Sequence, residues 1–181
     1  MFKPLTRQLE DGWMTVNRHT LYLFLALSVF ASDHAAATAG AADDGDVAFK
    51  LKDYGTAMKL LMPFAQRGDP VAETDVGMMY YGGLGVPLDR AEGVKWFMSS
   101  AKQGTLGGEV DMGIAYATGE GIRKDRLQAY MWFSLAADQG SASGVRYRDR
   151  ITTELKPDEV QRAQDMASTC RNSNFKICGL P

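Results

Sequence analysis

The sequence has very little histidine and cysteine. Its 181 residues include two of each, and both histidines, His19 and His34, lie near the N-terminus. Histidine is the commonest metal ligand and a frequent general acid or base. Its absence from the rest of the chain therefore argues against a catalytic or metal centre there. We predict no metal site, no cofactor and no enzymatic activity.

An excess of basic charge is also missing. Lysine and arginine number 20 against 22 aspartates and glutamates, which gives a net charge of −2. Domains that bind nucleic acids usually carry a clear basic excess, so we predict no nucleic-acid partner. The length and the hydrophobic content of 45% are those of one globular domain of ordinary size.

The chain lacks a hydrophobic run long enough to span a membrane. Its apolar stretch at residues 21–30 is far shorter than the roughly 20 residues that a spanning helix needs. Small-x-small cleavage sites follow at Ala37 and Ala39, as is typical of a secretory signal. We predict a signal peptide at residues 1–39 and a mature protein that is periplasmic or secreted and does not span a membrane. The alternative to a cleaved signal peptide is an uncleaved anchor. The true start is expected at Met14, because acidic residues precede it.

The sequence does contain an internal repeat with a period of thirty-six residues. The recurring pairs include Gly77 and Gly113, Tyr80 and Tyr116, Gly83 and Gly119, Gly85 and Gly121, Asp89 and Asp125, and Trp96 and Trp132. A fixed period of this length indicates an array in which each unit is one supersecondary element.

Each repeat contains two stretches of helical periodicity. Apolar residues recur at helical spacing over 72–83 and over 94–101, with a glycine-rich, proline-containing linker between them. Asp89 is predicted to begin the second helix in a capping box with Glu92, and Asp125 has the same place in the next repeat. We predict an all-α fold, a short α-solenoid of helix–turn–helix units with a C-terminal capping helix.

Two pairs of repeated residues predict packing. Gly77 and Gly113 fall in the middle of helices, where glycine costs up to about 1 kcal/mol relative to alanine, so we expect close helix–helix contact there. Trp96 and Trp132 fall on helical faces with other apolar residues. We expect both to be buried and both to cost roughly 3–5 kcal/mol when truncated to alanine.

The repeated residues resemble the Sel-one-like repeat, a longer relative of the tetratricopeptide repeat. The residues that carry the resemblance in the first repeat are Gly77, Tyr80, Gly83, Gly85, Val86, Asp89, Trp96, Phe97, Ala101 and Gly104. The resemblance covers residues 44–152 and implies a scaffold for protein–protein interaction. Periplasmic members modulate sensor kinases or envelope assembly, which implies a possible regulatory role in the cell envelope. Gly93 replaces an alanine of the family pattern, and we expect this to loosen one contact.

The rest of the chain fits an array with atypical ends, as terminal repeats usually are. The expected solenoid, residues 43–155, divides into a degenerate unit 43–68, full repeats 69–104 and 105–140, and a half unit 141–155. Residues 156–181 are expected to form the capping helix and its tail. In the half unit, Val145 and Ile151 are expected to point inward.

The cysteines, Cys170 and Cys178, both lie in this tail. An even pair in an exported chain predicts one disulfide, and closing so short a loop would contribute roughly 2.5 kcal/mol in the chain-entropy model. We expect the closed loop to hold Phe175 and Ile177 against the capping helix.

One short motif leaves an enzymatic alternative. Ser99 and Lys102 match the Ser-x-x-Lys acylation motif of penicillin-binding enzymes, and some relatives in this repeat family have been linked to β-lactam binding. The motif lies near the C-terminal end of a predicted helix, where no backbone N–H group would support an oxyanion. The alternative function is therefore a β-lactam- or cell-wall-directed hydrolase.

Four recurring acids have two interpretations. Glu73, Asp75, Glu109 and Asp111 would form an acidic strip along stacked first helices, or they would complement the dipoles near helix N-termini. We prefer the helix-dipole interpretation.

Apolar residues that differ between the repeats predict the partner site. Met78, Tyr81 and Ile114 lie beside the buried face of the first helices. They are too apolar for a helix face that is exposed to solvent and binds nothing. Methionine and tyrosine are favoured at binding surfaces. We hypothesise that the three residues line a groove for another protein or a peptide. The alternative, that they pack between adjacent repeats, is equally supported.

Export can be tested on the natural protein. We expect protein recovered from the cell envelope to have lost its first residues up to Ala37 or Ala39, because the apolar run is too short to remain as an anchor. Intact-mass spectrometry measures this directly. A mass that still includes residues 21–30 would contradict the prediction.

Overall fold

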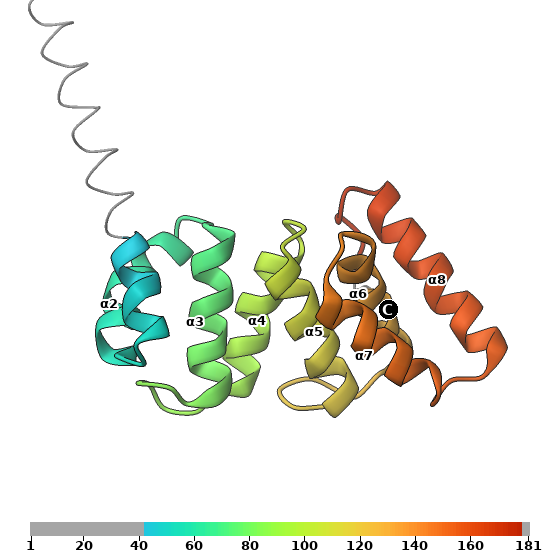
Figure 1. Cartoon of the computed structure of the whole chain (residues 1–181), viewed down its shortest axis with the longest axis horizontal. Coiled ribbons are helices and arrows are strands. Elements are labelled where there is room, and N and C mark those ends of the chain that lie inside the picture. The colour runs from blue at the N-terminus through green and yellow to red at the C-terminus, as the bar shows by residue number, and fades with distance from the viewer. Residues whose placement is uncertain (1–41, 179–181) are drawn as a thin grey trace, which may run out of the picture. The chain divides into compact units, whose positions relative to one another are not determined.

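The computed structural model describes residues 42–178 and shows a row of helices (Figure 1). Residues 42–50 are helical, and the helices that follow are α2 (Tyr54–Ala65), α3 (Pro70–Gly82), α4 (Arg90–Ala101), α5 (Leu106–Thr118), α6 (Arg126–Asp138), α7 (Ala142–Thr152) and α8 (Pro157–Asn172). No strand occurs in this part of the chain, so the predicted all-α solenoid is confirmed. The predicted signal peptide, with His19, His34 and Met14, lies outside the described residues.

Aspartates begin the second helices as predicted, but the capping boxes are incomplete. The Asp89 carboxylate accepts a hydrogen bond from the Glu92 N–H at 2.9 Å. The Glu92 carboxylate does not return a bond to Asp89 and instead pairs with Lys95 at 2.8 Å. The Asp89 N–H donates to the carbonyl of Tyr80 at 2.9 Å, so the preceding helix supplies the acceptor that the capping box would have supplied.

Within each repeat the two helices touch at a glycine. A β-carbon placed on Gly77 would lie 2.6 Å from Cδ1 of Phe97, and one on Gly113 would overlap the ring of Phe133. Real β-carbons do not approach other atoms so closely. The mid-helix glycines therefore let a phenylalanine ring approach the backbone of the neighbouring helix closely.

Neighbouring repeats touch at a second glycine. Gly85 has a φ of +71°, and a β-carbon on it would lie 2.7 Å from the Tyr54 β-carbon at the start of α2. Gly121 lies in the same way against the backbone of Arg90, at the start of α4. Tyr54 and Arg90 are themselves thirty-six residues apart. The loop of each unit therefore rests on the second helix of the unit before it.

Gly93 tightens the first repeat instead of loosening it. A β-carbon on Gly93 would lie 2.8 Å from the Gly77 carbonyl oxygen and 2.8 Å from the Tyr81 β-carbon. In the second repeat, alanines stand at both corresponding places, Ala129 and Ala117. Gly93 therefore lets α4 approach the backbone of α3 closely at Gly77 and Tyr81, and the expected loss of a contact is wrong.

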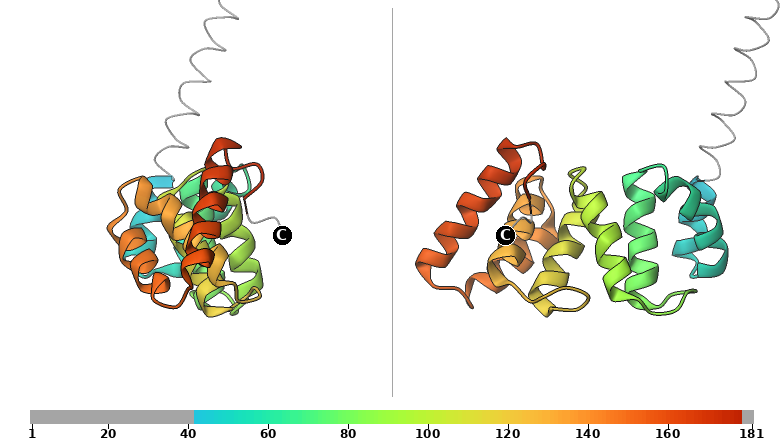
Figure 2. Two further views of the ribbon diagram at one scale, coloured as in Figure 1. Left: turned by 90° about the vertical axis from the view of Figure 1, so that its right-hand side faces the viewer. Right: turned by 180° about the vertical axis from the view of Figure 1, so that it is seen from behind.

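The C-terminal helix α8 packs on α6 and not on α7, which it follows in the chain. In Figures 1 and 2 it lies at the end of the row, inclined to its neighbours. Since α6 also contacts α5 and α7, every residue from Gln128 to Ala136 is buried. Ile151 is buried as expected, whereas Val145 is 37% exposed, because α7 has no hairpin partner to cover it.

A disulfide between Cys170 and Cys178 closes the tail, with the Cα atoms 4.8 Å apart. The loop brings Phe175 to Gly104, where a β-carbon would lie 3.3 Å from the ring. Phe175 thus reaches the end of the first full repeat, beyond the capping helix. Ile177 is 47% exposed, so the prediction that the loop holds it against the capping helix is wrong.

The two repeated tryptophans are not equivalent, contrary to the prediction from their spacing. Trp132 is fully buried, whereas Trp96 is only partly buried against the N-terminal core cluster. We expect Trp132→Ala to lower the free energy of unfolding by about 3–5 kcal/mol and Trp96→Ala to lower it by about 1–2 kcal/mol. Urea unfolding measures both, and equal losses would contradict the assigned difference in burial.

Candidate functional site

The first helices of the repeats form one face of the solenoid, which we call the first-helix face (α3, α5 and α7). Successive members touch, since α3 contacts α5 and α5 contacts α7. The second helices α4 and α6 make no comparable contact. The first helices of successive units therefore lie side by side along the row, and solenoids usually bind their partners on an extended surface built from successive repeats.

The three predicted partner-binding residues lie on or beside this face but do not share one hollow. Met78, Tyr81 and Ile114 are all half-buried and pack against the larger core cluster. Ile114 lines a pocket, and the other two do not.

Tyr81 packs between adjacent repeats. Its ring lies 5.4 Å from that of Phe97, measured between centroids. Its hydroxyl reaches the next repeat, at 3.5 Å from Thr118 Oγ1 and 3.3 Å from Glu120 Oε2. These contacts favour the packing alternative for this residue.

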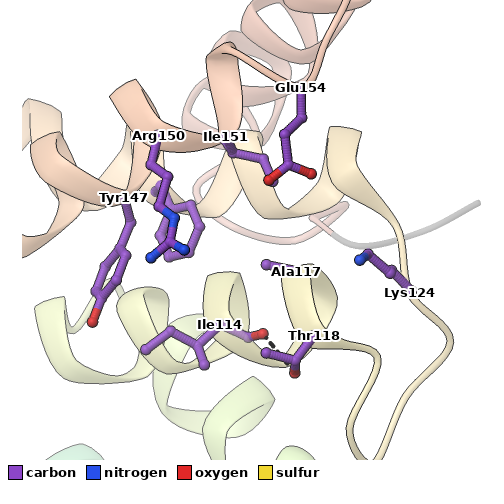
Figure 3. Close-up of a pocket in the computed structure, with 9 residues that line it drawn as sticks. Ile114, Ala117, Thr118, Lys124, Tyr147, Arg150, Ile151 and Glu154 are labelled. Carbon is purple, nitrogen blue, oxygen red and sulfur yellow. Dashed lines mark hydrogen bonds between the residues drawn. The ribbon is translucent and has the colours of Figure 1, made fainter.

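The pocket lies between α5 and α7 and has a volume of about 260 Å³ (Figure 3). Its lining is mainly apolar, with charged side chains at the edge. The residues are Ile114, Ala117, Thr118, Lys124, Phe133, Tyr147, Arg150, Ile151 and Glu154.

One difference between the repeats lies beside the pocket. Ala117 stands thirty-six residues after Tyr81, just as Phe133 follows Phe97. In the first repeat the Tyr81 ring packs on Phe97. In the second, an alanine stands in that place and Tyr147 of α7 stacks on Phe133 instead, with the ring centroids 5.2 Å apart, so that Phe133 is buried as well. The pocket opens beside Ala117, at the place that corresponds to Tyr81.

Charged groups stand at the edge of the pocket. Figure 3 places Arg150 and Lys124 on opposite sides, with Ala117 between them. The third charged residue, Glu154, is held by Arg126 at 2.8 Å. Within residues 42–178 neither Lys124 nor Arg150 forms an ion pair, so the unpaired charge at the edge is positive.

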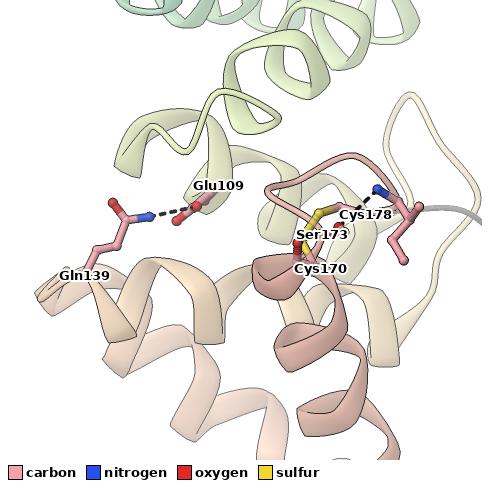
Figure 4. Close-up of a disulfide and its surroundings, with 6 residues drawn as sticks. Glu109, Gln139, Cys170, Ser173 and Cys178 are labelled. Carbon is pink, nitrogen blue, oxygen red and sulfur yellow. Dashed lines mark hydrogen bonds between the residues drawn. A yellow bond between two sulfur atoms is a disulfide. The ribbon is translucent and has the colours of Figure 1, made fainter.

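The recurring glutamates lie in the first turns of α3 and α5, as the helix-dipole interpretation expects, and their carboxylates also accept hydrogen bonds from the second helices. The buried Glu73 accepts hydrogen bonds from Ser99 Oγ at 2.6 Å and from Gln103 Nε2 at 2.9 Å. Glu109 is also buried and accepts one from Gln139 Nε2 at 2.8 Å (Figure 4). Each carboxylate therefore links the start of a first helix to the end of the second helix in the same repeat.

The two glutamates differ because Leu135 stands where the first repeat has Ser99. The hydroxyl donor is lost, and Oε2 of Glu109 has no hydrogen-bond partner among the described residues. A buried carboxylate that is only half satisfied favours its neutral form. Burial raises the pKa of Glu109 to about 8.

The recurring aspartates, without the glutamates, lie near other carboxyl groups, as the acidic-strip interpretation expects in part. Burial, followed by the charge of Asp46, raises the pKa of Asp75 to about 7. Burial, followed by the charge of Asp75, raises the pKa of Asp111 to about 7. Asp75 on α3 is thus close enough to both Asp46 and Asp111 for their charges to influence one another.

The residues of the acylation motif are engaged in the fold. Ser99 Oγ donates to Glu73, and Lys102 is the exposed C-cap residue of α4. This bond explains the serine without a catalytic role.

Within residues 42–178, no group of histidine, cysteine, aspartate and glutamate side chains is placed to hold a metal ion. None of the described helices is long and apolar enough to cross a membrane.

Sequence reasoning placed Ala117 in the same apolar stripe as Ile114 without assigning it to the groove, and it missed Lys124 and Tyr147 as parts of the site. The available signal was the change from Tyr81 to Ala117, which removes a large side chain from a repeated position. Tyr147 had no signal of this kind, because its stacking depends on the position of α7.

Comparisons with known proteins agree with the fold. A family model described as Sel1 repeat matches residues 70–105 and 108–141. A protective antigen present in uropathogenic Escherichia coli strains, displaying an SLR fold, is similar with a TM-score of 0.71 and 22% identity. That match covers 80% of this chain and 33% of the antigen. A Sel1 repeat protein from Oxalobacter formigenes is similar with a TM-score of 0.60 and 25% identity, over 76% of this chain and 62% of that one.

The chain thus spans about a third of the first solved protein and less than two thirds of the second. No curated protein matches it.

The unsatisfied Glu109 predicts a pH dependence of stability. Its folded pKa of about 8 exceeds the ordinary 4.5, so the folded state binds more protons between these values. Stability should therefore fall as pH rises from about 4.5 to 8, and Asp75 and Asp111 act in the same direction. Glu109→Gln should flatten this decline and raise stability at pH 8, as measured by urea unfolding at several pH values.

Glu73→Gln is the matched control, because both Glu73 oxygens already accept hydrogen bonds. The amide group of the new glutamine would face a hydrogen-bond donor. We therefore expect the free energy of unfolding to fall by about 1–3 kcal/mol at neutral pH. A Glu109→Gln variant as destabilised as this control would contradict the assignment.

Proposed function

This chain is a Sel1-like repeat protein, and we propose that it is a scaffold whose first-helix face holds a partner protein. An apolar side chain of the partner enters the pocket between α5 and α7. The role in the cell is then set by the partner, and we propose a regulatory role in the cell envelope.

The mainly apolar pocket beside Ala117 is the observation that carries the proposal. Both repeats are otherwise built alike, with a glycine under the phenylalanine ring and a carboxylate linking the two helices. The first repeat has Tyr81 packed on its phenylalanine, whereas the second has Ala117 at that position and the pocket next to it. A mainly apolar pocket with a few charged groups at its edge is a typical feature of binding sites.

We propose that the protein works outside the cytoplasm. The Cys170–Cys178 disulfide supports this location, because structural disulfides persist mainly in oxidising compartments. The apolar stretch and alanine cluster of the leader support it independently. The hydrolase alternative has no comparable support, since Ser99 is bound to Glu73.

Ala117→Tyr tests the pocket. Copying the tyrosine of the first repeat should fill the volume next to Phe133, leave the thermal midpoint of unfolding within a few degrees of the wild-type value, and abolish partner capture. Capture is measured by photo-crosslinking in envelope extract, followed by mass spectrometry of proteins that wild type binds.

Ala91→Tyr provides the matched control. It adds the same side chain at an exposed position of α4 that does not line the pocket, and it should capture the partner as wild type does. Undiminished capture by Ala117→Tyr would show that the pocket is not the binding site.

A further inference from the structure

We propose that the partner presents an acidic segment with one aromatic or large aliphatic side chain. The apolar side chain enters the pocket between α5 and α7, and neighbouring carboxylates pair with Lys124 and Arg150. This inference rests on the proposed function and specifies the chemistry of the partner.

The size of the pocket selects a single side chain. Sites for drug-sized ligands typically measure about 300–1,000 Å³, and this pocket measures about 260 Å³. Its floor consists of Ile114 and the stacked rings of Phe133 and Tyr147. Aromatic rings pack well against such a floor, and a large aliphatic side chain gains from the same apolar burial.

The charged residues at the edge of the pocket favour a negatively charged partner. Lys124 and Arg150 are exposed and have no ion-pair partner in the described part of the chain. Glu154 lines the same pocket, but Arg126 already binds its carboxylate at 2.8 Å. Charges across protein interfaces are arranged to be complementary, so the two free cations fit carboxylates that flank the inserted side chain.

The positions of the two cations decide where the partner's carboxylates lie. Lys124 follows α5, and Arg150 lies in the last turn of α7. The partner's carboxylates therefore lie toward the C-terminal ends of α5 and α7.

Selection from random peptides tests the inference without knowledge of the partner. Short peptides displayed on phage are selected on the full chain, synthesised with a fluorophore, and titrated by fluorescence anisotropy. We expect the selected peptides to contain an aromatic or large aliphatic residue next to aspartate or glutamate. The double variant Lys124→Ala/Arg150→Ala should bind them about tenfold more weakly, and added salt should weaken wild-type binding.

Two further variants separate charge from folding. Lys102→Ala/Arg123→Ala removes the same charge from exposed positions that do not line the pocket, and it should bind like wild type. Lys124→Glu/Arg150→Glu should reject the acidic peptides while keeping the wild-type circular dichroism spectrum.

The outcomes distinguish this inference from the proposed function. Suppose that Ala117→Tyr abolishes binding, but that the selected peptides lack acidic residues or bind Lys124→Ala/Arg150→Ala as tightly as wild type. The proposed acidic segment is then wrong, and the pocket remains the binding site. If the selected peptides bind Ala117→Tyr as tightly as wild type, both the inference and the proposed function are wrong.

Discussion

The contact between a mid-helix glycine and a phenylalanine ring is the constraint on which the solenoid depends. Gly77 receives Phe97, and Gly113 receives Phe133. The absence of a β-carbon sets how closely the two helices of a repeat approach, and a larger residue would force them apart. The same contact fixes Phe133 at the floor of the pocket. A position that the fold requires thus also supplies the central surface of the proposed site.

Buried carboxylates add a second link between the two helices of each repeat. The two repeats differ in how many hydrogen bonds this carboxylate accepts. Glu73 has a donor for each oxygen, whereas Glu109 has one donor for two oxygens. The difference follows from one replacement, of Ser99 by Leu135. A buried charged group without a full set of hydrogen bonds is destabilising, so the pKa of Glu109 rises and the second repeat becomes sensitive to pH.

Repetition allows the positions that build the fold to be separated from those that are free to bind. Residues that serve every unit recur, as Asp89 and Asp125 do at the helix starts. The pocket arises where recurrence fails, at Ala117, and its cations come from a loop and from α7. Partner binding in this array therefore depends on residues that differ between the repeats. Solenoids with similar backbones bind different partners through such residues.

The sequence by itself determined the helices, their pairing and the period, because glycines, caps and apolar spacing act over a few residues. It also indicated the disulfide, since both cysteines lie close together in the tail. Tertiary structure decided where α8 packs, which left Val145 exposed and buried residues 128–136 of α6 on all sides. It also decided that Tyr81 covers Phe97 while Tyr147 stacks on Phe133. These outcomes depend on contacts between helices distant in the chain, and a single period contains no information about which neighbour covers which face.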